Sequence, residues 1–108
     1  MSFGLSNDTI AKICAVFAQF PEIERAIIYG SRAQGNDKKG SDIDLSLIGK
    51  GLSQATLYRV LDALDELLLP YGIDLSIFEQ IDQPALREHI QRVGSVFYQR
   101  TPGGMACA

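Results

Sequence analysis

The chain has 108 residues, which is enough for one domain with one core but not for a catalytic domain followed by a separate substrate domain. Hydrophobic residues make up 46% and charged residues 21%, as is ordinary for a soluble globular domain. Thirteen acidic and ten basic side chains give a net charge of -3, so the basic surface with which proteins grip long DNA or RNA is not expected.

The cysteines and the hydropathy pattern indicate a reduced, cytoplasmic protein. Neither Cys14 nor Cys107 belongs to a C-x-x-C pair or has a histidine close by, so zinc binding is not predicted. A disulfide between them is possible, but free thiols are the default in the cytoplasm. The sequence shows no N-terminal targeting pattern and no apolar run of membrane-spanning length, so no membrane contact is expected.

The first half of the chain predicts a helix, a strand, a loop and a second strand. Residues 7–20 open with polar capping residues and then repeat apolar residues at helical spacing. Residues 25–29 contain a short β-branched run, typical of a buried strand, which ends at Gly30. Residues 36–40 are polar and end in glycine, as in a loop, and residues 42–48 alternate polar with apolar side chains, as in a half-buried strand.

The second half predicts a helix, a strand, a shorter helix and an edge strand. Ser53 caps a helix whose leucine stripe, over residues 57–68, is interpreted as core rather than as a groove for a partner. Residues 73–78 alternate as a third strand, and residues 84–94 form a shorter helix that begins with proline and ends with glycine. Residues 95–99 are predicted as an edge strand.

These elements define one domain over residues 1–100. Residues 101–108 have nothing to pack with and are expected to form a disordered tail. The order is helix, strand, short helix or loop, strand, helix, strand and helix. Such an order predicts an α/β (α+β) fold in which helices cover a small mixed sheet.

Three aspartates on two predicted strands are candidate metal ligands. Asp42 and Asp44 project from the same face of one strand, with their Cα atoms about 6–7 Å apart. Asp74 is the second residue of the next strand, so the three carboxylates meet if the two strands are neighbours. Their mutual repulsion calls for a cation, and hard oxygen ligands favour magnesium or manganese over zinc. Alternatively, each aspartate only occupies the solvent face of an amphipathic strand.

The segment Gly30, Ser31 and Arg32, directly after the first predicted strand, is a candidate anion site. Glycine lets the backbone approach a ligand, and amide groups with a hydroxyl at a helix start can bind phosphate. The alternative is a plain strand-to-helix turn with Ser31 as the N-cap. The P-loop and dinucleotide fingerprints are both missing. A phosphate site followed by paired carboxylates is nevertheless what nucleotidyl transfer requires.

Both motifs occur at the spacing of a known signature. G-S, ten residues and D-x-D resemble the signature of the DNA polymerase beta-like nucleotidyltransferase superfamily. The fuller run G-S-R-A-Q-G-N-D-K-K-G-S-D-I-D-L resembles its minimal branch, the MNT-domain proteins. The resemblance covers residues 7–98 and implies the DNA polymerase beta-like nucleotidyltransferase fold.

The resemblance also implies a role for each residue of the motifs. Gly30 and Ser31 would bind the triphosphate of a donor such as ATP. Many relatives carry a basic residue where Gln34 stands, so the affinity for phosphate is either weaker here or rests on Arg32 instead. Catalysis and the binding of two Mg²⁺ ions would fall to the three carboxylates of Asp42, Asp44 and Asp74.

Members of this minimal branch resemble the antitoxins of two-gene modules. The partner implied by that resemblance is a helical HEPN-domain ribonuclease toxin, which the nucleotidyltransferase silences by adding AMP to a tyrosine. Two alternatives remain open. The chain could neutralise a toxin by binding alone, or it could be a small-molecule nucleotidyltransferase that a partner subunit completes.

Overall fold

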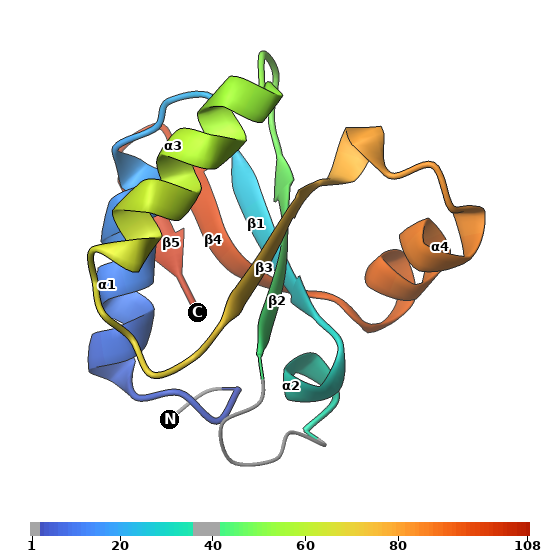
Figure 1. The fold of residues 1–108 in the computed structure, drawn as a ribbon, viewed down its shortest axis with the longest axis horizontal. Coiled ribbons are helices and arrows are strands. Elements are labelled where there is room, and N and C mark those ends of the chain that lie inside the picture. The colour runs from blue at the N-terminus through green and yellow to red at the C-terminus, as the bar shows by residue number, and fades with distance from the viewer. Residues whose placement is uncertain (1–2, 36–41) are drawn as a thin grey trace.

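The computed structural model describes residues 3–35 and 42–108, and within them five strands form one mixed sheet (Figure 1). The strand order is β3-β2-β1-β4-β5; β2 and β3 run parallel, and the other neighbours are antiparallel. The elements in chain order are α1 (Asn7–Ala18), β1 (Arg25–Tyr29), α2 (Ser31–Gln34), β2 (Ile43–Ile48), α3 (Gln54–Asp65), β3 (Ile73–Ile77), the 3-10 turn η1 (Phe78–Gln80), α4 (Pro84–Val93), β4 (Ser95–Thr101) and β5 (Gly104–Cys107).

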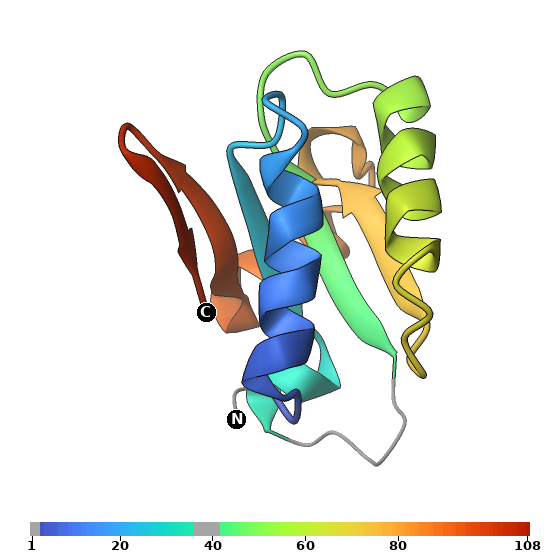
Figure 2. The same ribbon diagram turned by 90° about the vertical axis from the view of Figure 1, so that its left-hand side faces the viewer.

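Helices lie on both sides of the sheet. α1 and α3 cover one face, and α4 lies on the opposite side against β1 (Figures 1 and 2). The core fills the space between the sheet and the α1–α3 layer, because Ile43, Leu45 and Leu47 of β2 are fully buried there. The alternate residues of β2 therefore point to the α4 side. This is the predicted α+β architecture.

Local sequence signals account for the main helices. Ser6 and Ser53 cap α1 and α3, because each hydroxyl accepts a hydrogen bond from the amide three residues later, at 3.1 Å and 3.3 Å. Pro84 opens α4 and Gly94 follows its last turn, as predicted. No helix in the described part of the chain is long and apolar enough to span a membrane.

The C-terminal segment differs most from the sequence analysis. β4 was expected at an edge, but it pairs with both β1 and β5. Residues 101–108 were expected to be disordered, whereas Gly104–Cys107 pairs with β4. Pro102 and Gly103, a turn-forming pair, close this hairpin. All four β5 residues are exposed, so the strand is held by its backbone pairing with β4 and not by apolar burial. The expectation of disorder considered only apolar burial.

A disulfide joins Cys14 of α1 to Cys107 of β5, with 6.4 Å between the two Cα atoms. Free thiols were expected, because they are the default in the cytoplasm. The β4–β5 hairpin brings together the two cysteines, which are 93 residues apart in the sequence. The loop predicted over residues 36–40 lies outside the described residues.

Candidate active site

The pairing of β2 with β3 brings two of the three aspartates side by side. In the parallel register, Asp44 lies opposite Asp74, and on its other side Asp44 lies opposite Tyr29 of β1. Neighbouring strands in a sheet are about 4.8 Å apart, so the carboxylates of Asp44 and Asp74 emerge as immediate neighbours. Asp42 lies two residues before Asp44. The strands are therefore neighbours, which is the condition for the carboxylates to meet.

The three carboxylates interact electrostatically, with Asp44 at the centre. Asp42 and Asp74 are exposed, while Asp44 is half-buried. Burial raises the pKa of Asp44 above its ordinary value of 3.8, and the charges of Asp74 and then Asp42 raise it further. The positive charge of Arg32 acts in the opposite direction. The site is thus an acidic cluster in which the central carboxylate resists ionisation.

Two glycines let the backbone pack directly on these carboxylates. Gly30 has φ 78° and ψ -155°, a conformation that is essentially restricted to glycine. A Cβ atom there would lie 2.5 Å from Oδ2 of Asp44. A Cβ atom on Gly72, just before β3, would lie 2.8 Å from Oδ1 of Asp42. The sequence analysis assigned Gly30 to the binding of a triphosphate, and in the structure a Cβ atom at this position would first meet the Asp44 carboxylate.

The Gly30–Ser31 turn begins α2 beside this cluster. Gly30 is the N-cap of α2 and Ser31 its first residue, with no side-chain capping hydrogen bond. The alternative in which Ser31 serves as the N-cap is therefore wrong. Ser31 is half-buried, and it directly follows Gly30, at which an added Cβ atom would reach the Asp44 carboxylate.

Arg32 is almost fully buried, at 3% exposure. Its Nη1 donates a hydrogen bond to the carbonyl oxygen of Phe3 at 2.8 Å, and its guanidinium carbon lies 4.9 Å from the centre of the Tyr71 ring. Arg32 therefore ties α2 to the N-terminal segment and to the turn before β3. Its charge also reaches Asp44, and this supporting role was not predicted from the sequence.

Three hydroxyl groups continue the row of carboxylates along the same face. Ser76 Oγ and Ser46 Oγ are hydrogen-bonded at 3.1 Å across β2 and β3. Burial raises the pKa of Tyr29, a hydrogen bond with Ser76 opposes this, and the charges of Asp74 and Asp44 raise the pKa further. The sequence analysis missed these residues, although a signal existed: Asp-Leu-Ser occurs at residues 44–46 and again, in register, at residues 74–76.

The donor chemistry suits a hard cation such as Mg²⁺, because all three side chains offer carboxylate oxygens and their charges repel one another. However, within residues 3–35 and 42–108 no three His, Cys, Asp or Glu side chains are grouped closely enough to hold one ion. The carboxylate of Asp44 is turned toward Gly30 and that of Asp42 toward Gly72. The strand pairing places the three aspartates next to one another, but their side chains would have to converge to bind one ion.

The raised pKa of Asp44 predicts an unusual pH dependence of stability. Because the folded state binds this proton more tightly than the unfolded state, ionisation of Asp44 lowers stability as the pH rises through the folded pKa. Asp44→Asn should therefore be more stable than the wild type at pH 7, by less than about 1 kcal/mol because the group is partly exposed. This difference should shrink below pH 4. Urea unfolding at both pH values measures it, with Asp82→Asn, outside the cluster, as the control.

Asp42, Asp44 and Asp74 form an acidic row on the mixed sheet, beside the Gly30–Ser31 turn. This arrangement defines a nucleotidyltransferase fold, and comparison identifies the family. The polymerase beta nucleotidyltransferase model matches residues 11–102. The chain belongs to that family, which confirms the prediction from the G-S and D-x-D motifs. No curated protein matches the chain at a significant level of sequence similarity.

Solved structures share the fold at low sequence identity. A chain from a crystal structure of a toxin–antitoxin with AMP-PNP is 20% identical, with a TM-score of 0.66 over 85% of this chain and 72% of that one. A chain from the structure of a tri-AMPylated Shewanella oneidensis HEPN toxin in complex with MNT antitoxin is 16% identical, with a TM-score of 0.63 over 85% of this chain and 71% of that one. A proposed nucleotidyltransferase from Sulfolobus solfataricus is 19% identical, with a TM-score of 0.54 over 95% of this chain and 96% of that one.

Proposed function

We propose that this chain is an Mg²⁺-dependent nucleotidyltransferase that transfers AMP from ATP to a tyrosine of a HEPN-domain toxin and so acts as its antitoxin. The observation that carries the proposal is the pairing of Asp44 with Asp74, flanked by Asp42 and by the Gly30–Ser31 turn. The likeness to a toxin–antitoxin with AMP-PNP and to a complex with an AMPylated HEPN toxin supports the choice of donor and partner.

In this proposal the residues of the site divide the work. Asp42, Asp44 and Asp74 would hold Mg²⁺, which supplies positive charge to offset the negative charge of the triphosphate. The amides at the start of α2 and the Ser31 hydroxyl would donate hydrogen bonds to phosphate oxygens. Arg32, which is buried and engaged with Phe3 and Tyr71, would add a fixed positive charge next to these groups.

The transfer step requires a deprotonated acceptor oxygen in line with the leaving group. One carboxylate of the cluster would orient the acceptor hydroxyl and accept its proton. The acceptor oxygen forms a bond to the α-phosphorus, the bond from that phosphorus to the bridging oxygen breaks, and pyrophosphate leaves.

The openness of the site favours an acceptor on another protein. Asp42 and Asp74 are exposed, so the acidic row opens to solvent. A macromolecular acceptor brings its own surface and can supply the positioning that transfer requires. The net charge of -3 argues against a nucleic-acid acceptor.

Mass spectrometry of the partner tests the proposal. Co-expression of this chain with a HEPN-domain toxin should leave the toxin heavier by one or more AMP units, and peptide mapping should locate the AMP on a tyrosine. An unmodified toxin in cells that this chain still protects would show neutralisation by binding alone. Transfer of AMP to a small molecule, seen only with a partner subunit, would favour the remaining alternative.

A further inference from the structure

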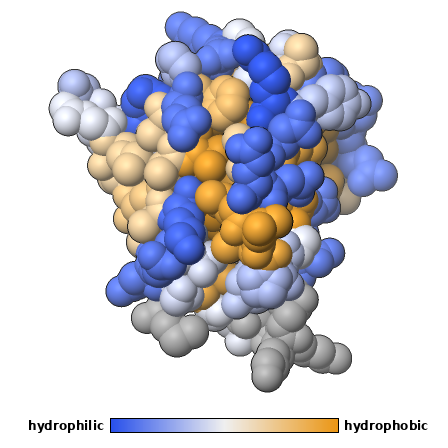
Figure 3. All heavy atoms as spheres, turned by 60° about the vertical axis from the view of Figure 1, so that its left-hand side comes forward, coloured by the Kyte–Doolittle hydropathy of each residue, from blue (hydrophilic) through white to orange (hydrophobic). Residues whose placement is uncertain are grey.

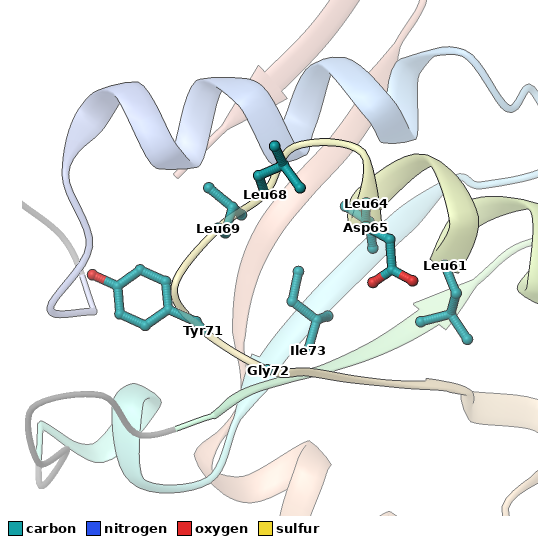
Figure 4. Close-up of a pocket in the computed structure, with 8 residues that line it drawn as sticks. All are labelled: Leu61, Leu64, Asp65, Leu68, Leu69, Tyr71, Gly72 and Ile73. Carbon is teal, nitrogen blue, oxygen red and sulfur yellow. The ribbon is translucent and has the colours of Figure 1, made fainter.

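A second feature of the molecule lies at the end of α3. A groove of about 230 Å³ opens between the last turns of α3 and the turn before β3, and we call it the α3–β3 groove (Figure 4). It is lined by Leu61, Leu64, Asp65, Leu68, Leu69, Tyr71, Gly72 and Ile73, five of which are leucine or isoleucine. The sequence analysis assigned the leucine stripe to the core, but part of it borders this groove.

Leu68 is the clearest departure from a buried stripe. α3 ends at Asp65, and Leu68 then takes φ 53°, a left-handed conformation that costs a leucine about 1–2 kcal/mol. Its side chain is 87% exposed. Figure 3 shows hydrophobic side chains gathered among hydrophilic ones on the face formed by α1 and α3. An exposed leucine at the rim of a groove that other leucines line is a candidate contact point for another molecule.

The charges around the groove indicate what kind of molecule fits. Asp62, Asp65 and Glu66 are exposed at the C-terminal end of α3, and in the described part of the chain none of them has an ion pair. The last turn of α3 carries no basic residue, so these carboxylates face the negative end of the helix dipole, which is unfavourable. A positively charged partner would relieve that repulsion. The complementary occupant is therefore apolar and basic.

Two residues that line the groove, Tyr71 and Gly72, also contact residues of the acidic site. The carbonyl oxygen of Gly72 accepts a hydrogen bond from the amide of Ile43 at 2.9 Å, and Gly72 lies against the Asp42 carboxylate. The Tyr71 ring, which also lines the groove, packs on Arg32. Asp74 follows Gly72 by two residues. A molecule seated in the groove would therefore lie next to the site at which transfer is proposed.

We propose that the α3–β3 groove docks a basic, amphipathic helix of the acceptor protein. The apolar face of that helix enters the groove near Leu61 and Leu68, and its Lys or Arg side chains meet Asp62, Asp65 and Glu66. This inference rests on the proposed function, because it gives the acceptor a docking site that would hold its hydroxyl near the carboxylates. Asp65 and Leu68 do not belong to the cluster of Asp42, Asp44 and Asp74, so the two sites are separable by mutation.

Two variants test the docking without weakening the fold. Leu68→Ser removes an exposed side chain, and Asp65→Lys places a favourable charge at the helix end, so neither should lower stability. Each should weaken the affinity for a purified HEPN-domain partner by about tenfold in calorimetry. The matched controls are Met105→Ser, an exposed residue of β5, and Glu79→Lys, an exposed residue of η1; both should bind like the wild type.

The outcomes separate docking from catalysis. Affinity for a non-hydrolysable ATP analogue should be the same in all four variants. If the partner binds and Leu68→Ser and Asp65→Lys retain wild-type affinity, the docking proposal is overturned while the proposed function stands. If the wild type does not bind the HEPN partner, the choice of partner fails. A synthetic Leu- and Lys-rich amphipathic helix then decides: NMR shifts at Leu61, Tyr71 and Ile73 support the groove, and no shifts there overturn it.

Discussion

Asp42→Asn should abolish AMP transfer while leaving the protein folded. Asparagine keeps the shape of the side chain but removes the charge that would hold a hard cation. Replacing residues that merely support metal ligands costs about 10–100-fold in activity, so replacing a direct ligand should cost at least that much. Intact-mass analysis of the co-expressed toxin measures the effect, which should appear as loss of the added AMP.

The exposure of Asp42 makes this a clean experiment. Because the side chain is exposed and belongs to a cluster of like charges, its neutralisation should not lower the unfolding midpoint. Asp82→Asn removes the same charge outside the cluster and should transfer AMP like the wild type. A folded Asp42→Asn protein that modified the toxin at the wild-type rate would exclude Asp42 from the catalytic site.

The part of the site that could be predicted from the sequence is the part set by strand alternation. Asp42 and Asp44 share a face because side chains alternate along any strand, whatever lies around it. The approach of Asp74 depended on one further condition, that β2 and β3 are neighbours, and the register of the sheet meets it. The first requirement, strand alternation, is local in the sequence, and the second needs only the pairing of β2 with β3. The residues that match the family model, 11–102, include all three aspartates.

The remaining features depend on contacts between distant parts of the chain. The sequence analysis considered Arg32 only as a phosphate contact. In the structure it is buried against Phe3 and Tyr71, because the fold brings three segments together around it. The disulfide between Cys14 and Cys107 likewise follows from the β4–β5 hairpin. Helical periodicity cannot show where α3 ends, so the exposure of Leu68 was also missed.

Gly30→Ala should remove transfer activity and destabilise the fold. The backbone of Gly30 lies in a region that other residues adopt at a cost of about 1–3 kcal/mol. The added Cβ atom would also lie 2.5 Å from Oδ2 of Asp44, so the carboxylate must move. Transfer should therefore fall with the loss of Asp44 from its position, and the urea midpoint should fall with the strain.

Gly51→Ala is the matched control, because Gly51 has φ 75° and an added Cβ atom would meet nothing within 4 Å. It should be destabilised by its left-handed backbone and still transfer AMP. A double-mutant cycle isolates the contact itself: Gly30→Ala should cost less stability in an Asp44→Ala background, because the carboxylate it strikes is gone. Equal costs in both backgrounds, or normal transfer by Gly30→Ala, would mean that Gly30 is needed only for its backbone conformation and does not hold Asp44 in place.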